Sequence, residues 1–257
     1  MKVQEVLAAV NAIAPFETQE GWDNSGLLVG SVWQEVKHVM VALDISAKVV
    51  DHAVEKGCDM IVSHHPVIFD PLTKLTAEHP VYQLASNNMT AICCHTPLDM
   101  VEGGINDLLV EKLREKLGLT EEVFPLEEGG LGRIVTLAEP KSVEDIAKIA
   151  KEVLKCHTVR YLDAGVNGEK VKTLAICGGS GSSLLELADE LHADALLTGD
   201  VKHDRWYAAQ DNYISLIDCG HYHTEIGMVA FLAKKLKEVL PDLEVTECAL
   251  EEPVKYV

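Results

Sequence analysis

The sequence predicts an α/β protein made of two similar α/β domains, with mixed sheets flanked by helices. Three observations support this prediction. Short apolar runs of strand length alternate with segments whose apolar residues recur at helical spacing, which is typical of α/β folds. The alternation lapses once, near the middle of the chain, and restarts with elements of similar length. The chain has 257 residues, of which 47% are hydrophobic, so it is long enough for two domains of ordinary size.

The first half of the chain alternates helices and strands. The apolar residues of segment 3–13 recur at helical spacing, which predicts an amphipathic first helix that ends before Pro15. Ser46 and Gly118 are residue types that favour the N-terminal and the C-terminal cap of a helix. We therefore predict two further helices, at residues 46–56 and 103–117. Apolar runs predict strands at residues 36–43, 59–62 and 89–94.

The alternation lapses over residues 121–132, where one proline and three glycines stand close together in the sequence EEVFPLEEGGLG. Such a cluster of turn-forming residues favours a linker, so we expect one domain of residues 1–125 and another of residues 126–257. Beyond this boundary, apolar runs predict strands at residues 132–137, 158–161, 170–177, 195–198 and 214–218. Helical spacing predicts helices at residues 142–155, 183–191 and 221–240.

The composition narrows the classes of function. A formal net charge of −19 disfavours nucleic acid and anionic membranes as partners, although a bound metal pair would still admit a phosphate-bearing small molecule. No apolar run approaches the ~18–20 residues of a membrane helix. The apolar N-terminal stretch includes Glu5 and Asn11, which favours an amphipathic helix over a signal peptide. The seven cysteines form no CxxC pair, which favours free thiols and a cytoplasmic protein.

Two adjacent histidines, His64 and His65, follow a predicted strand. Open α/β sheets bind ligands at the carboxyl ends of their strands, so both imidazoles stand where sites form. Adjacent side chains leave an extended chain on opposite sides. Both can therefore bind metal only if the chain turns or if they bind two different ions. Pro66 keeps His65 out of the helical conformation.

A second pair, His95 and Asp99, follows the next predicted strand. This segment brings an imidazole and a carboxylate to the same edge of the sheet within one turn of chain. Taken alone, His95 could equally be a structural core histidine, and Asp99 could be a helix cap.

A third pair, His221 and Glu225, follows the predicted strand at residues 214–218. Gly220 allows a sharp turn from strand into helix. Residues four apart lie on the same face of a helix, so the two side chains can bind one cation. His223 faces elsewhere, and we interpret it as a structural residue or a support for the ligands.

Together the three pairs predict a metal centre. Neutral imidazoles and carboxylates suit zinc, manganese or iron better than calcium or magnesium alone. Five or six such ligands exceed the needs of one catalytic ion, which keeps a position open for water. We therefore expect two divalent ions that share Glu225 as a bridge. The alternative is that the histidines are ordinary structural residues.

Three further segments are candidates for the rim of this site. Residues 198–205 would place positive charge near a bound anion. The glycine turn at residues 178–181 could hold an oxyanion with its backbone N–H groups, although such turns often only connect a strand to a helix. The polar segment at residues 21–26 could line the pocket through Asp23 and Asn24, or it could be a simple turn.

These segments occur in the order seen in a known family. They are GWDNSGLLVG, SHHP, HTPLD, GGSG, TGDVKH and GHYHTE, and they span nearly the whole chain. The chain resembles the NIF-three-like family of dinuclear-metal proteins, whose bacterial members are also described as homologues of a type 2 GTP cyclohydrolase I. It is similar to the compact form that lacks an inserted middle domain.

The resemblance implies a two-domain α/β subunit with the metal site in the cleft between the domains, assembled as a toroidal homohexamer. His95 is not a firmly assigned ligand in this pattern, so we expect it, like His203, to be a proton-transfer residue or a support for the ligands. Glu225 is expected to touch both ions. The ligand positions of the family fall on His64, His65, Asp99, His221 and Glu225.

The leading hypothesis is a dinuclear metal-dependent hydrolase that uses a metal-activated water. The resemblance narrows the reaction to opening of the guanine ring of GTP with release of formate, which makes the expected partner a small-molecule nucleotide. Two alternatives stay open. A metal-binding regulatory or interaction protein would bind metal without turnover, and a nucleotide phosphoesterase would release phosphate instead.

Overall fold

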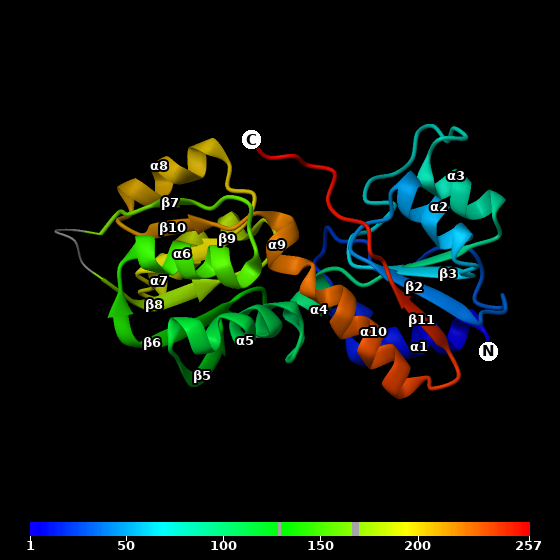
Figure 1. Ribbon diagram of the computed structural model, residues 1–257, viewed down its shortest axis with the longest axis horizontal. Helices are drawn as coiled ribbons and strands as arrows, with labels where there is room; N and C mark the ends of the chain where they lie inside the picture. Colours follow the sequence, from blue (N-terminus) through cyan, green and yellow to red (C-terminus); the bar gives the residue numbers. More distant parts are fainter. Residues whose placement is uncertain (128–129, 166–169) are drawn as a thin grey trace. The chain divides into compact units, whose positions relative to one another are not determined.

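The computed structural model describes residues 1–127, 130–165 and 170–257. Within them the chain forms two compact units (Figure 1). Unit 1 comprises Met1–Val101 and Met228–Glu252, and unit 2 comprises Glu102–Gly227 and Pro253–Val257.

Unit 1 contains a five-stranded sheet with the order β1-β4-β3-β2-β11. The strands are β1 (Gly26–Val29), β2 (His38–Ala42), β3 (Met60–Ser63), β4 (Thr90–Cys93) and β11 (Glu244–Glu247). β1 is antiparallel to β4, and the other neighbours are parallel. The three central strands are buried along their whole length, as expected for parallel strands covered on both faces. Because Ser63 pairs with Cys93, β3 and β4 end at the same edge.

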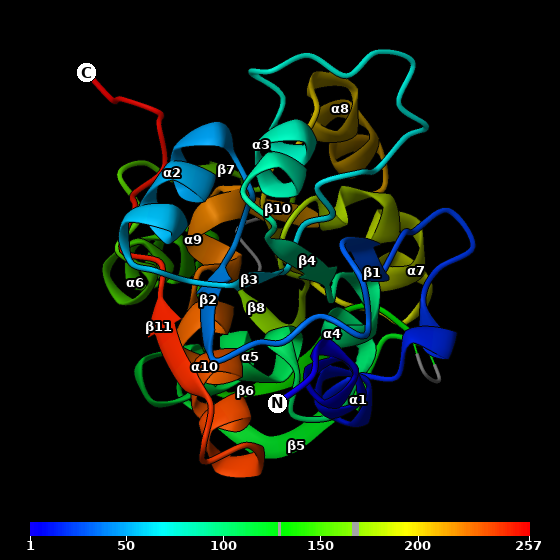
Figure 2. The same ribbon diagram turned by 90° about the vertical axis from the view of Figure 1, so that its right-hand side faces the viewer.

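Helices cover both faces of this sheet (Figure 2). α2 (Ala47–Glu55) and α3 (Pro80–Ser86) lie on one face, and α1 (Val3–Ile13) and α10 (Gly227–Val239) lie on the other. The short helices η1 (Phe16–Thr18) and α4 (Thr96–Met100) complete the unit. The core beneath α2 and α3 is apolar and includes Met40, Val50, Ile61 and Leu84.

Unit 2 contains a six-stranded mixed sheet with the order β5-β6-β8-β9-β10-β7. β8, β9 and β10 are parallel, and the remaining pairs are antiparallel. The strands are β5 (Leu119–Pro125), β6 (Arg133–Lys141), β7 (Arg160–Leu162), β8 (Val171–Ile176), β9 (Ala195–Thr198) and β10 (Ser215–Asp218).

The two faces of this sheet belong to two separate cores. Leu174 and Ile176 of β8 pack into the core formed with α5 (Ile105–Leu117) and α6 (Val143–Leu154). Ala175, between them, packs into the core formed with α7 (Leu185–Glu190) and α8 (His203–Asp211). Successive strand residues point to opposite faces, so continuous apolar strands fill both cores. The short helices η3 (Gly181–Leu184) and α9 (His221–Glu225) complete the unit.

The predicted fold class is confirmed, because both sheets are mixed and flanked by helices. The division of the chain differs from the expected boundary near residue 125. α5 packs against α6, and β5 pairs with β6, which places residues 102–125 in unit 2 and not in unit 1. The C-terminal strand β11 returns to pair with β2 in unit 1. Of the expected linker at 121–132, residues 128–129 lie outside the described residues.

Other elements also differ from the prediction. β1, β5, β11, α3 and α8 were not predicted, since the strands among them are short or partly exposed and lack a continuous apolar run. The helix predicted at 221–240 is divided into α9 and α10 at Ile226. The cysteines are free thiols, as predicted, and burial raises the pKa of Cys58 to about 11. Among the described residues, no helix combines the length and apolar character needed to cross a membrane.

Candidate metal centre

Two histidine-bearing loops of unit 1 leave the sheet at the same edge. The ladder continues one or two residues past the strands, since His64 N donates to Ala42 O at 3.2 Å and His65 N donates to Leu43 O at 2.9 Å. Cys94 N likewise donates to Ser63 O at 2.9 Å. The backbone is therefore held by regular hydrogen bonds up to the point where the imidazoles begin.

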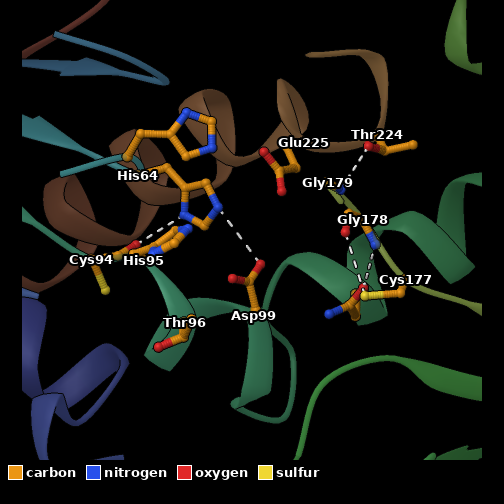
Figure 3. Close-up of polar contacts among 12 residues, drawn as sticks. His64, Cys94, His95, Thr96, Asp99, Cys177, Gly178, Gly179, Thr224 and Glu225 are labelled. Carbon is orange, nitrogen blue, oxygen red and sulfur yellow. Dashed lines mark hydrogen bonds and ion pairs between the residues drawn. The ribbon is translucent and has the colours of Figure 1, made fainter. Parts of the chain in front are cut away.

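The imidazole of His64 is fully buried and held in one tautomer (Figure 3). Its Nδ1 lies 3.0 Å from Cys94 O. A carbonyl oxygen can only accept, so Nδ1 carries the proton and the neutral ring has its lone pair on Nε2. This Nε2 lies 3.6 Å from Asp99 Oδ1, on the buried helix α4. Asp99 is inside that helix and is not its N-terminal cap, which is His95.

His65 is oriented by a carboxylate. Its Nδ1 lies 2.7 Å from Asp44 Oδ1, and Asp44 follows β2, the neighbouring parallel strand. The nitrogens of His64, His65 and His95 include ligand atoms that all lie within 4.8 Å of one another. Unit 1 thus brings three of the predicted site histidines into a group that could bind a metal ion.

His95 is oriented by Asp23, which belongs to the polar segment near the N-terminus. His95 Nδ1 lies 2.8 Å from Asp23 Oδ1, while Asp23 Oδ2 accepts from Thr96 N at 3.1 Å and from Ser25 Oγ at 3.0 Å. Burial alone would raise the pKa of Asp23, but the hydrogen bonds from His95 and Thr96 outweigh it and hold the pKa well below its usual value of 3.8. Asp23 is therefore a carboxylate that supports His95.

Unit 2 contains the third predicted pair. Gly220, with φ of +79°, turns the chain from β10 into α9. His221 Nε2 then lies 3.0 Å from Glu225 Oε2, one helical turn later, as the i, i+4 spacing predicted. His221 Nδ1 lies 2.9 Å from Asp200 Oδ2. Glu225 is buried, so its carboxylate faces the interior of the protein.

In both units, an aspartate contacts Nδ1 of a histidine that follows a neighbouring parallel strand. In unit 1, Asp44 follows one strand and His65 follows its parallel neighbour. In unit 2, Asp200 follows β9 and His221 follows β10. In each unit the aspartate lies 21 residues before the histidine that it contacts. Asp44 was not predicted as part of the site, and Asp200 was predicted only as part of the rim segment 198–205. The signal that could have identified the supporting role of both is an acidic residue just after the preceding strand.

The glycine turn of unit 2 has a different role from the one expected. Gly178 N donates to Asn106 Oδ1 at 2.9 Å, and Gly179 N donates to Thr224 Oγ1 at 3.0 Å (Figure 3). These N–H groups are therefore bonded within the protein, which argues against an oxyanion cradle. A Cβ atom on Gly179 would lie 2.2 Å from Glu225 Oε1. The turn instead leaves room for the carboxylate.

The expected basic rim is also largely engaged in structural contacts. Arg205 Nη2 lies 2.6 Å from Glu186 Oε2, and Arg205 Nε donates to Ser182 O at 3.1 Å. The ring of His203 contacts Tyr207 at 5.2 Å between centroids. His223 is buried, and its ring contacts His157 at 5.4 Å between centroids.

The donor groups of each unit suit a transition-metal ion. In unit 1, His64, His65 and His95 each have Nδ1 next to an oxygen that orients the ring, and the Asp99 carboxylate lies near His64. In unit 2, His221 has Nδ1 next to Asp200 and Nε2 next to the buried carboxylate of Glu225. Histidines that bind zinc or iron typically donate their other N–H to a carboxylate or a carbonyl. The glycine at position 179 preserves the space in front of Glu225. These features suit nitrogen and oxygen coordination better than a purely structural role.

Comparison with known proteins identifies relatives along the whole chain. The family model described as Duf34/NIF3 (NGG1p interacting factor 3) matches residues 1–253. A Clostridium acetobutylicum protein named GTP cyclohydrolase 1 type 2 homolog is 32% identical over 246 residues, which cover 93% of this chain and 91% of the relative. A Helicobacter pylori protein named GTP cyclohydrolase 1 type 2 is 34% identical over 241 residues, which cover 91% of each.

Solved structures share the fold. A Staphylococcus aureus hypothetical protein superposes with a TM-score of 0.86 and 28% identity, over 100% of this chain and 99% of that chain. Reduced HcgD from Methanocaldococcus jannaschii superposes with a TM-score of 0.83 and 28% identity, over 97% of this chain and 98% of that chain.

Proposed function

We propose a function for this chain from one premise, which is that it belongs to the Duf34/NIF3 family. The protein is a dinuclear metal-dependent hydrolase. Its two divalent ions, zinc, manganese or iron, are held by His64, His65, Asp99, His221 and Glu225. One observation carries this proposal. Each site histidine has Nδ1 beside an oxygen that can accept its N–H, so Nε2 is the nitrogen that remains to bind a metal ion.

The metal ions, when bound, would supply a water of lowered pKa and positive charge for a developing oxyanion. The chain itself orients the ligands and handles protons. His95 is the proposed proton-transfer residue, because its Nδ1 contacts Asp23 and its ring contacts His64. A proton taken up at Nε2 makes an imidazolium, which the adjacent carboxylate stabilises.

The proposed substrate follows from the names of the relatives. The Helicobacter pylori relative is named GTP cyclohydrolase 1 type 2, so the candidate reaction is hydrolytic opening of the guanine ring of GTP, with release of formate. The family description, NGG1p interacting factor 3, names an interaction. It supports a second candidate function, which is a metal-binding regulatory protein without turnover. A phosphoesterase would use the same ligands but release phosphate.

The test begins with metal content per chain, measured by elemental analysis of protein purified without chelators. We expect about two equivalents in the parent and a sharp loss in the His64→Ala/His65→Ala variant. His52→Ala is a matched control, because His52 lies on α2 and its Nδ1 contacts Glu55 at 4.0 Å. A parent that holds no metal and takes up no added Zn²⁺, Mn²⁺ or Fe²⁺ would contradict the proposal.

The metal-loaded protein is then incubated with GTP, and formate and phosphate are both measured. Formate release that depends on His95 supports the cyclohydrolase reaction. Phosphate release alone would identify a phosphoesterase. If the protein binds two metal ions but releases neither product with any metal or at any pH, the result would contradict the hydrolase and favour the regulatory role.

A further inference from the structure

Two exposed aromatic rings stand beside the histidine group of unit 1. Trp22 is 56% exposed and Phe69 is 49% exposed. Their ring centroids are 6.0 Å apart. Both rings also contact the imidazole of His95, Trp22 at 5.9 Å and Phe69 at 6.3 Å between centroids. The two rings therefore form a partly open aromatic surface with His95 at its edge.

Polar contacts of neighbouring residues position the two segments that carry these rings. Asn24 Nδ2 donates to Ile68 O at 2.7 Å, which joins the segment that carries Trp22 to the loop that carries Phe69. Asp23, next to Trp22, contacts His95 and accepts from Thr96 N at 3.1 Å. Both rings are thus positioned by their neighbours in the sequence, although half of their surface contributes nothing to the core. Large apolar groups kept exposed in a fixed position are typical of binding sites.

We propose that Trp22 and Phe69 form a stacking surface for a planar heteroaromatic ring, such as a nucleobase. This rests on the proposed function and names the substrate class of the same site. Aromatic side chains bind such rings through offset stacking and edge-to-face contacts, whatever the identity of the base. Because both rings contact His95, a ring stacked on them lies next to the residue proposed to transfer a proton. That adjacency favours a small-molecule ligand over a protein partner.

The net charge of the chain favours recognition of a ligand through its heteroaromatic ring over recognition through its phosphate groups. At −19, the protein does not attract the phosphate groups of a nucleotide by its overall field. Stacking is independent of charge, so a nucleoside without phosphate should still bind to this surface.

The experiment uses the intrinsic fluorescence of Trp22. The sequence contains three tryptophans, so the Trp33→Phe/Trp206→Phe variant reports on Trp22 alone. We expect guanosine, adenosine or cytidine to quench this fluorescence saturably and ribose to leave it unchanged. Equilibrium dialysis then measures binding of the same nucleosides to proteins with all other residues unaltered. Trp22→Ala and Phe69→Ala should each bind about tenfold more weakly than the parent, and Trp22→Phe should bind almost as well as the parent.

Trp33→Ala is the matched control, since Trp33 is also in unit 1, is 72% exposed and lies outside the aromatic surface. It should leave nucleoside binding unchanged. No saturable quenching by any of the three nucleosides would overturn the proposal. The same holds for a Trp22 signal that responds only to protein concentration, which would assign the rings to contacts between copies of the chain.

Binding and turnover are measured separately, so the two proposals can fail independently. Saturable quenching without formate or phosphate release would retain the stacking surface and count against the hydrolase. Formate release with unaltered Trp22 fluorescence would retain the hydrolase and remove the stacking surface.

Discussion

Asp23 joins the polar N-terminal segment to His95 through a single buried carboxylate. Its Oδ1 lies 2.8 Å from His95 Nδ1, and its Oδ2 accepts from Thr96 and Ser25. These contacts outweigh burial and keep the pKa of Asp23 far below 3.8. The carboxyl group therefore binds protons less readily in the folded state than in the unfolded state.

This predicts a pH-dependent loss of stability. A lowered folded-state pKa contributes stability that is fully present above the unfolded-state pKa and is lost as pH falls towards the folded-state pKa. Asp23→Asn should cost about 2 kcal/mol of unfolding free energy at neutral pH, since it weakens hydrogen bonds to a charged group. Urea unfolding of parent and variant should show this difference shrinking below about pH 4.

The control for this prediction is Asp51→Asn, at an exposed position on α2. It should shift stability little at any pH. Equal pH dependence of unfolding in the parent and in Asp23→Asn would show that Asp23 is not the depressed carboxyl.

A second prediction concerns the space that Gly179 leaves for the Glu225 carboxylate. Its φ is +63°, and an added Cβ would lie 2.2 Å from Glu225 Oε1 and 3.2 Å from His221 Nε2. Gly179→Ala should therefore displace the Glu225 carboxylate and weaken metal affinity about tenfold or more, as a disturbed ligand environment does. Competition with a chromophoric chelator measures that affinity.

Gly57→Ala separates the steric effect from backbone strain. Gly57 also has a positive φ, +71°, but nothing lies within 4 Å of its added Cβ. Both variants should lose about 1 kcal/mol of stability through the left-handed backbone. Unchanged metal affinity in Gly179→Ala would exclude the proposed role of this glycine.

At the scale of elements, helix caps were predictable because they are local. Ser46 Oγ accepts from Val49 N at 3.3 Å, and Ser142 Oγ accepts from Asp145 N at 3.1 Å. Each serine directly precedes its helix, so residue type and position suffice to predict the cap. The edge strands β1 and β11 were missed because their partners lie far away in sequence and only some of their residues are buried.

The cap of α6 provides a prediction at this scale. Ser142→Ala should destabilise unit 2 by about 1 kcal/mol, because the N–H of Asp145 loses its acceptor. Ser142→Asp should retain most of the stability, because its carboxylate can accept the same hydrogen bond. Thermal unfolding of the three proteins checks the order, and an alanine variant as stable as the parent would contradict it.

At the scale of the whole molecule, we propose a homohexamer, as the resemblance to the family implies. Light scattering of the metal-loaded protein should give a mass about six times the 28.1 kDa of one chain. The high net negative charge makes chains repel one another, so added salt should favour the assembly. A mass of one or two chains at all salt concentrations would refute the hexamer.

Local patterns of residues were enough to predict the fold class and the position of the candidate ligands after their strands. His64, His65 and His221 could be placed at strand ends because the apolar runs before them are local and continuous. The spacing of His221 and Glu225 predicted their contact, since it depends only on one helical turn.

The groups that orient those ligands come from distant segments, which come together only when the chain folds. The oxygens beside Nδ1 of the site histidines belong to residues between 21 and 72 positions away in the sequence. Asp44, Cys94 and Asp200 reach their histidines because parallel strands pair in register, and Asp23 reaches His95 from a separate loop. Such contacts depend on how distant segments pack, which no local pattern of residues encodes.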